Sequence, residues 1–302
     1  MTVKFKHIRV VPSPSKSRFP MCTSLLVDDG DTMAVIDPGA GREALQAAIG
    51  ERLVDMVINT HWHFDHISGN YLFPQTELWM NPIEAEGFSD LRRVAEWFGV
   101  REVYGDSGVT EWIEKVADPH TPQTEFSPCY RHEWWLSTRS PDRTYPYNKE
   151  WQIGQARVIM VHAPGHTQGS CCPYFPDEGL VYTVDFDLTS FGPSCANVDG
   201  DFNEFIASAR RIAQLDADWF LTGHQAGMFS RSEFRARLDD FLDIINKRQQ
   251  RLIGLLEAGV KPEDVHKHGL LYPSEYQMDP CIYMWERVGV RKHLELLKTR
   301  SG

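Results

Sequence analysis

Cysteine is scarce in this sequence: six occur in 302 residues, and no two are spaced as Cys-x-x-Cys. A density this low excludes a small disulfide scaffold. Long apolar runs are also missing, since none approaches the ~18–20 residues needed to cross a bilayer. The N-terminal segment lacks an apolar h-region and a small-residue cleavage site. We therefore expect a reducing, cytoplasmic setting and no membrane partner.

Basic residues are fewer than acidic ones: the sequence has 31 Lys and Arg and 42 Asp and Glu, which gives a net charge of −11. Nucleic acids are bound through basic footprints. The most basic stretch, at 247–251, is typical of a solvated helix face, so no nucleic-acid partner is expected. Internal repeats and low-complexity tracts are absent too. What remains is an ordinary globular composition, 42% apolar and 24% charged, in a chain long enough for one large domain or two average ones.

Alternation, turn residues and helical periodicity predict strands first mixed with helices and then a helical tail. The predicted strands cover 3–11, 22–27, 32–36, 53–59, 77–80, 151–153, 156–162, 171–175, 180–184 and 218–221. The predicted helices cover 42–49, 67–73, 83–98, 202–215, 231–257 and 284–298, with a short one after Pro262. Ser230 and Glu233 match a capping box at the start of the longest helix. This order indicates an α/β core with a C-terminal helical appendage.

The stretch at about 99–149 shows little periodicity and many Pro, Trp and Tyr residues, which predicts an irregular insertion. We expect one domain over 1–230 that contains this insertion, and a helical extension over 231–302 that packs on the core. Aromatic residues gather in both segments outside the core: Trp112, Phe126, Tyr130, Trp134, Trp135, Tyr145 and Tyr147, then Tyr272, Tyr276, Tyr283 and Trp285. Three roles stay open for them: a lid and pocket for an apolar acyl group, a homodimer contact, or ordinary packing.

A dense group of metal-ligand residues follows the strand at 53–59, in the segment Thr60-His-Trp-His-Phe-Asp-His66. His61 and His63 are two apart and can face the same way in extended chain. Asp65 and His66 follow where the chain turns into a helix, which directs them to the same place. Imidazole and carboxylate suit zinc and similar divalent ions. The alternative is a surface cluster of histidines, and the rest of the chain argues against it.

Three further residues repeat this placement at the exits of other predicted strands. His166 lies in Pro-Gly-His-Thr, Asp185 follows Val184, and His224 lies in Thr-Gly-His. Each alone is more often structural than a ligand. Together they bring ligand types to four strand exits, where sites of α/β proteins assemble. The sequence therefore predicts one metal site built from distant segments.

This motif set resembles the metallo-β-lactamase superfamily, specifically its dinuclear hydrolases of the glyoxalase II and lactonase type, over roughly residues 20–230. The resemblance implies a four-layer αββα sandwich with two divalent metal ions at one edge. Zinc is the metal that it indicates first, with iron or manganese as alternatives. The resemblance also assigns each ligand to an ion. The first ion would be held by His61, His63 and His166, and the second by Asp65, His66 and His224. Asp185 would bridge the two ions.

The implied reaction is hydrolysis of a thioester, lactone or other ester-like bond of a small-molecule substrate. A metal-bridging hydroxide is the nucleophile, because paired divalent ions lower the pKa of a shared water. Asp65 orients this nucleophile and carries its proton, which makes it the catalytic side chain. Asp37 matches a family position that supports the ligands from behind, with a turn-starting aspartate as the alternative.

The substrate is left open by this resemblance. Asp185 stands where the best-known β-lactamases have a cysteine, and the tyrosine that often follows in lactonases is missing from Asp185-Phe-Asp-Leu188. Arg287, Arg291 and Lys292 cannot be aligned with the glutathione-binding group of glyoxalase II. Two alternatives remain besides a hydrolase. One is an iron-dependent oxidoreductase like the persulfide dioxygenases, which would need three of the seven ligands, and the other is a non-catalytic ligand-binding member of the fold.

Overall fold

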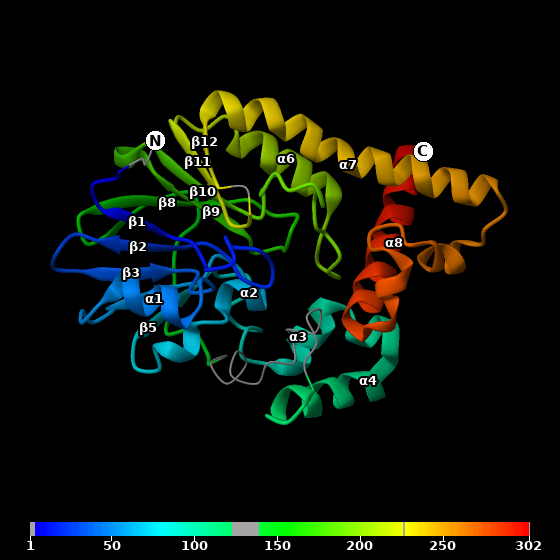
Figure 1. Ribbon diagram of the computed structural model, residues 1–302, viewed down its shortest axis with the longest axis horizontal. Helices are drawn as coiled ribbons and strands as arrows, with labels where there is room; N and C mark the ends of the chain where they lie inside the picture. Colours follow the sequence, from blue (N-terminus) through cyan, green and yellow to red (C-terminus); the bar gives the residue numbers. More distant parts are fainter. Residues whose placement is uncertain (1–3, 123–138, 226, 302) are drawn as a thin grey trace.

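Two six-stranded sheets face each other, with helices on the outside of both (Figure 1). The computed structural model describes residues 4–122, 139–225 and 227–301. The first sheet contains β1 (Ile8–Val11), β2 (Ser24–Asp28), β3 (Met33–Ile36), β4 (Met56–Ile58), β5 (Glu77–Met80) and β6 (Arg143–Thr144), in that order. The second runs β12 (Met228–Ser230), β11 (Trp219–Thr222), β10 (Leu180–Val184), β9 (Cys171–Phe175), β8 (Ala156–His162) and β7 (Glu150–Ile153).

Parallel pairing is concentrated where ligand-type residues leave the strands. β3, β4, β5 and β6 run parallel to one another, whereas β1, β2 and β3 are antiparallel. In the second sheet only β10 and β11 are parallel among the described strands. Parallel neighbours end at the same edge of a sheet, so the segments after β10 and β11 leave the second sheet side by side, and the segment after β4 approaches them from the first sheet.

The inner strands, such as β2, β3 and β10, are buried on both faces, which explains their nearly continuous apolar sequences. Leu25 points into the core between the sheets, while Leu26 points outward into the cluster with α1 (Arg42–Ile49). In the same way Cys171 lies between the sheets and Cys172 lies under the outer helices of the second sheet. These alternations produce two outer helical layers around two sheets. The predicted four-layer αββα sandwich is confirmed.

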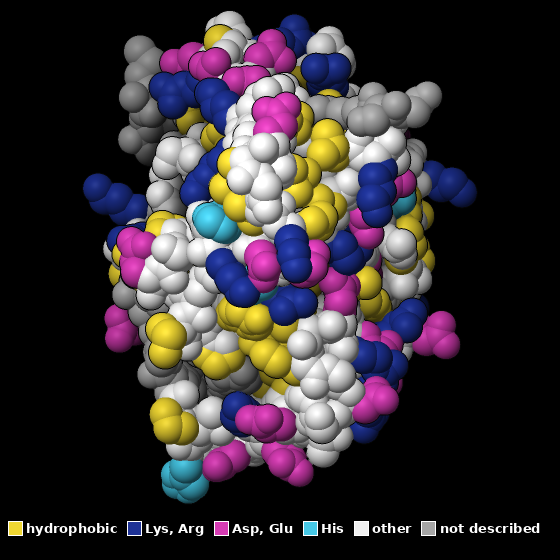
Figure 2. Space-filling model, turned by 90° about the vertical axis from the view of Figure 1, so that its right-hand side faces the viewer, with side chains coloured by type: hydrophobic (Ala, Val, Ile, Leu, Met, Phe, Trp, Pro, Cys, Tyr) yellow, Lys and Arg dark blue, Asp and Glu magenta, His cyan; other side chains and the backbone are white. Residues whose placement is uncertain are grey.

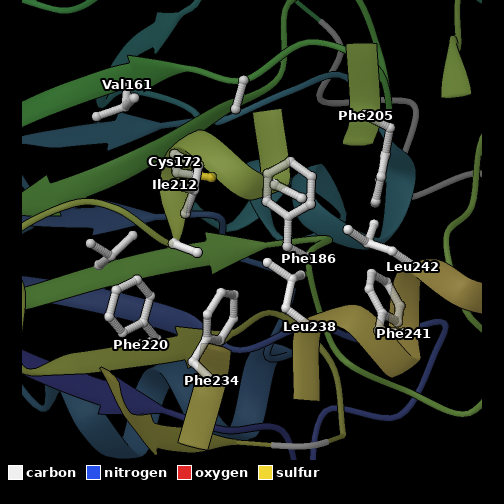
Figure 3. Packing of buried hydrophobic residues seen from close by; sticks show 14 of the residues in the cluster. Val161, Cys172, Phe186, Phe205, Ile212, Phe220, Phe234, Leu238, Phe241 and Leu242 are labelled. Atoms are coloured by element: carbon white, nitrogen blue, oxygen red, sulfur yellow. The ribbon is translucent and has the colours of Figure 1, made fainter. Parts of the chain in front are cut away.

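The outer layer on the second sheet consists of α6 (Phe202–Ile212) and α7 (Arg231–Glu257). Figure 3 shows their phenylalanines packing onto the strands, with Phe220 and Phe234 stacked at a 4.7 Å centroid distance. The predicted capping box begins α7, since the Glu233 backbone N–H donates to the Ser230 hydroxyl and the Ser230 N–H donates to the Glu233 carboxylate. Helix and sheet are thus joined through one buried aromatic cluster.

The prediction of an irregular insertion at 99–149 is wrong over residues 100–117, which are helical. α3 (Leu91–Phe98) and α4 (Val100–Ala117) form two consecutive helices. Gly99 separates them with φ 94°, and Gly105 kinks the second with φ 71°. These two interruptions break the helical period, which hid α4 from the sequence pattern. After residue 139 the chain returns to the first sheet through β6, which pairs with β5.

Other element boundaries differ by several residues. The helix expected at 83–98 begins only at α3, where the Asp90 carboxylate accepts from the Arg92 N–H. The helix expected at 67–73 is replaced by α2 (Phe64–Ile67) and a 3₁₀ turn. α8 (Pro280–Ser301) begins four residues before its predicted start at 284, and β12 was not predicted. Short elements next to turns gave the weakest patterns.

The C-terminal segment consists of α7, two 3₁₀ turns and α8, and α8 packs against α4 and α7. Whether the chain divides at residue 230 stays a prediction. On the end of the molecule formed by α7 and α8, Lys and Arg side chains are interleaved with Asp and Glu (Figure 2). In the parts of the chain that the structure describes, no helix combines the length and apolar character needed to cross a bilayer.

The aromatic residues of the insertion do not form a single cluster in the described part of the chain. Trp112 is buried among α3, α4 and α8, and Tyr145 is buried between the sheets, so both are packing residues. Tyr147 packs beside Tyr145. The remaining four, Phe126, Tyr130, Trp134 and Trp135, lie outside the described residues.

Candidate metal centre

Four of the predicted ligands come from one short segment after β4. His63 has an extended backbone, with φ −64° and ψ 138°, and stands immediately before α2. Asp65 and His66 lie in the first turn of this helix. His61, Asp65 and His66 are buried, with exposed fractions of 0 to 4%, and His63 is 8% exposed. The change from strand to helix therefore turns four side chains toward one point, as the sequence predicts.

The other three predicted ligands reach the same point from the second sheet. His166 lies in the loop between β8 and β9, Asp185 follows β10, and His224 follows β11. Val184 has φ 54° and lies at a register shift between β10 and β11. A β-branched residue at positive φ is a strained conformation, typical of functional sites. This bend at the end of β10 places Asp185 beside the histidines.

Asp185 occupies the middle of the group. Its Oδ2 lies 3.6 Å from His61 Nε2 and 3.5 Å from His66 Nε2. Its Oδ1 lies 3.5 Å from Nε2 of both His166 and His224. Such an arrangement lets one carboxylate face two sets of imidazoles at once.

The remaining two residues complete the sets. Asp65 Oδ2 lies 3.2 Å from His224 Nε2, and His63 Nδ1 lies 2.7 Å from His166 Nε2. Three groups of potential ligand atoms result, each within 4.8 Å: His61, His63 and His166; His61, His66 and Asp185; and Asp65, His66 and His224. The structure thus brings all seven predicted residues together.

Three histidines, His66, His166 and His224, present Nε2 to the centre. In each of them Nδ1 makes a hydrogen bond to another part of the protein. His166 Nδ1 donates to the Ser194 carbonyl at 2.7 Å, and His224 Nδ1 donates to the Met21 carbonyl at 3.0 Å. His66 Nδ1 donates to the Asp37 carboxylate at 2.9 Å. A proton on Nδ1 leaves the Nε2 lone pair free for a cation. Contacts of this kind set the tautomer and orientation of metal-binding histidines.

Burial and neighbouring charges favour the ligand forms of His61 and Asp185. Burial, together with nearby His66 and His63, lowers the pKa of His61 well below its ordinary value. Burial alone raises the pKa of Asp185, but His166 and the other histidines hold this pKa well below its ordinary value. A neutral imidazole and an ionised carboxylate are the forms that bind metal.

The residues present fit divalent cations. Among the described residues, His61 Nε2, His66 Nε2 and Asp185 Oδ2 are buried atoms with no hydrogen-bond partner in the protein. Buried polar atoms are normally paired, and these three face one another. A mixed imidazole and carboxylate set suits zinc, iron or manganese. The cluster is therefore able to bind metal ions.

A cleft of about 360 Å³ opens onto the cluster. Its walls include Phe19, Phe191 and Asn197, which the sequence analysis missed because they lie in loops without periodicity. The Arg248 guanidinium on α7 holds one of these loops by donating to the carbonyls of Phe191 and Pro193, at 2.6 and 3.1 Å. The wall is therefore braced from the C-terminal helices.

Gly165 fixes the loop that carries His166. Its φ is 125°, and a Cβ there would lie 2.1 Å from the Phe205 backbone nitrogen at the start of α6. We expect Gly165→Ala to lower the free energy of unfolding by about 3 kcal/mol or more, through backbone strain and overpacking. Urea denaturation measures this change.

Gly259 supplies the matched control, because its φ is also positive, at 87°, but nothing lies within 4 Å of its added Cβ. Gly259→Ala should cost only about 1 kcal/mol. Equal losses in the two variants would mean that the close approach to α6 contributes nothing.

The sequence profile of the Metallo-beta-lactamase superfamily matches residues 18–133 and 88–224, more than half of the chain. The chain belongs to this superfamily. Most members are metal-dependent hydrolases. The matched region contains all seven residues of the cluster and both sheets except β1 and β12.

Relatives of this superfamily member include the hydroxyacylglutathione hydrolases of Brucella ovis and Brucella abortus. Each is 25% identical over 186 residues, which cover 60% of this chain and 53% of the relative. The chain thus spans about half the length of the curated relatives that it matches. Among solved structures, a metallo-beta-lactamase family protein from Thermus thermophilus has a TM-score of 0.71 at 18% identity, covering 98% of this chain and 94% of that one. A beta-lactamase domain protein from Burkholderia ambifaria has a TM-score of 0.65 at 16% identity, covering 100% and 88%. These two likenesses show the fold.

Proposed function

We propose that this protein is a metal-dependent hydrolase that cleaves a thioester, lactone or other ester-like bond of a small molecule. The observation that carries the proposal is the convergence of seven His and Asp side chains on the wall of a cleft. The weak similarity to hydroxyacylglutathione hydrolases, whose name denotes hydrolysis of a glutathione thioester, supports the same reaction class.

Two ions fit the cluster better than one. His61, His63 and His166 would hold the first, and Asp65, His66 and His224 the second. Asp185 would contact both, because each of its oxygens faces one histidine of the first set and one of the second. When bound, divalent ions supply Lewis acidity toward a carbonyl oxygen and a water of lowered pKa.

Asp65 is the side chain best placed to handle the proton of an attacking water. It lines the cleft, and its Oδ2 lies 3.2 Å from His224 Nε2. Burial raises the pKa of Asp65, but His66 and the hydrogen bond from His224 lower this pKa below its ordinary value. An ionised carboxylate at the cleft wall can accept a hydrogen bond from water and hold it toward the substrate.

Elemental analysis combined with a hydrolysis panel tests the proposal. The purified chain is loaded separately with zinc, iron or manganese and assayed on thioesters, lactones, phosphodiesters and β-lactams. We expect two ions per chain and turnover of one ester-like class. His61→Ala and Asp65→Ala should abolish that turnover, whereas His120→Ala, on an exposed residue outside the cluster, should not.

Other outcomes would overturn the proposal. One iron per chain with oxygen consumption would indicate the oxidoreductase class, for which His61, His166 and Asp185 suffice. Stoichiometric metal without turnover of any panel substrate would indicate a ligand-binding protein. Hydrolysis that survives in His61→Ala would place the reaction elsewhere on the chain.

A further inference from the structure

Aromatic side chains from distant parts of the chain line one part of the cleft beside the cluster. Phe19 comes from the loop before β2, Phe64 and Phe98 from α2 and α3, and Trp285 from α8. Phe191 and Tyr272 line it from the loop after β10 and the segment before α8. Sites of this size with such walls bind apolar groups.

These rings form a continuous apolar surface. Phe19 contacts Phe64 and Trp285 edge-on, at centroid distances of 5.6 and 6.1 Å, and Phe64 stacks on Trp285 at 6.5 Å. Phe191 and Tyr272 meet at 5.2 Å. Phe64 is the neighbour of Asp65 in α2. The apolar surface therefore begins next to the reacting centre.

A buried carboxylate fixes the position of the chain segment that carries Tyr272. Glu286 on α8 has an exposed fraction of 0% and accepts hydrogen bonds from the backbone N–H groups of Leu270, Leu271 and Tyr272, at 2.5, 2.9 and 2.9 Å. These contacts tie the segment before α8 to the helix that carries Trp285. A preformed wall loses little entropy when a ligand binds.

Lys and Arg side chains are nearly absent from the cleft. Among its lining residues within the described ranges, Arg18 is the single Lys or Arg. Two basic residues of α8 are engaged elsewhere: Arg291 pairs with Glu102 and Glu295 at 2.6 Å, and Lys292 donates to the carbonyls of Val198 and Gly200. A glutathione moiety carries two carboxylates, so it would find few partners here.

We infer that the cleft binds an apolar acyl group, aromatic or medium-chain, carried on a neutral leaving group, and that Phe19 determines this specificity. The inference rests on the proposed hydrolase function. In the reaction, water adds to the acyl carbon, a new C–O bond forms and the C–S or C–O bond to the leaving group breaks. The leaving thiol or alcohol takes up a proton, and the products are an acid and that thiol or alcohol. No oxidant or reductant is required.

A series of substrates with one leaving group tests the acyl preference. The metal-loaded full chain is assayed on acetyl, butyryl, hexanoyl and phenylacetyl thioesters of N-acetylcysteamine, and on S-lactoylglutathione. If the hydrolysis panel identifies lactones instead, a series of γ-butyrolactones with the same alkyl increments on the α-carbon, which belongs to the acyl side, replaces the thioesters. We expect kcat/KM to rise about threefold per added methylene, and the glutathione thioester to be the poorest substrate.

Phe19→Ala tests the assigned residue. Phe19 is 40% exposed, so its loss should not unfold the chain. We expect the ratio of kcat/KM for hexanoyl over acetyl to fall about tenfold in this variant. Leu53→Ala removes an 86% exposed side chain that does not line the cleft, and it should leave the ratio unchanged.

The possible failures are distinguishable. Hydrolysis without dependence on acyl size, or with a preference for the glutathione thioester, would overturn the inference and leave the hydrolase function standing. An unchanged ratio in Phe19→Ala, with the preference present in the wild type, would remove the role assigned to Phe19. Absence of any hydrolysis would overturn the function, and the inference with it.

Discussion

Asp185→Asn is expected to lower kcat/KM by at least about 10³-fold, equivalent to about 4 kcal/mol of transition-state stabilisation. The carboxylate of Asp185 is the only group among the described residues that faces four imidazoles of the cluster, at 3.5 to 3.6 Å. An amide keeps the size of the side chain but has no charge, and one of its two polar atoms is a donor. It cannot offer an oxygen to each of two cations.

Metal content and kinetics should change together in this variant. We expect fewer than two ions per chain by elemental analysis, and a fall in kcat rather than a rise in KM alone. Asp243→Asn is the control, because Asp243 is a partly exposed residue of α7, outside the cluster, that pairs with its helix neighbours Asn246 and Lys247. Full activity with two bound ions in Asp185→Asn would refute a bridging role.

The ligand cluster could be predicted from the sequence because its geometry follows from local rules. Strand ends at one sheet edge, a two-residue spacing and a strand-to-helix turn are all visible in the motif around His61 and His63. His166, Asp185 and His224 each follow a clear apolar strand, so their placement follows from the fold. The order of strands and helices indicated an α/β core, whereas the four-layer sandwich was implied by the family resemblance.

The cleft could not be predicted, because its walls depend on long-range contacts. Tyr272 is held by Glu286, a buried carboxylate whose partners lie 14 to 16 residues away in an irregular segment. Phe19 and Phe191 lie in loops, where neither a helical nor a strand period marks a buried face. The aromatics of the tail do reach the site through Trp285 and Tyr272, whereas Trp112 and Tyr145 of the insertion are packing residues.

Asp37 provides the second large expected effect. Its side chain is fully buried and accepts from the Thr60 N–H at 2.8 Å, the Thr60 hydroxyl at 2.7 Å and His66 Nδ1 at 2.9 Å. Asp37→Ala leaves all three donors buried without this acceptor. We expect a loss of about 3–5 kcal/mol in the free energy of unfolding, measured by urea denaturation. The positive φ of 49° at this position adds strain for alanine.

Asp37→Asn separates the charge from the backbone conformation. Asparagine tolerates positive φ as aspartate does, and its oxygen can still accept from the Thr60 N–H. Its NH₂ group cannot accept from His66 Nδ1, so the orientation and tautomer of this histidine are no longer fixed. We expect metal affinity, measured by competition with a chelator, to fall about 10- to 100-fold, with much less loss of stability than in Asp37→Ala. Wild-type affinity in Asp37→Asn would mean that the residue serves the turn after β3 and not the metal centre, which is the alternative that the sequence alone left open.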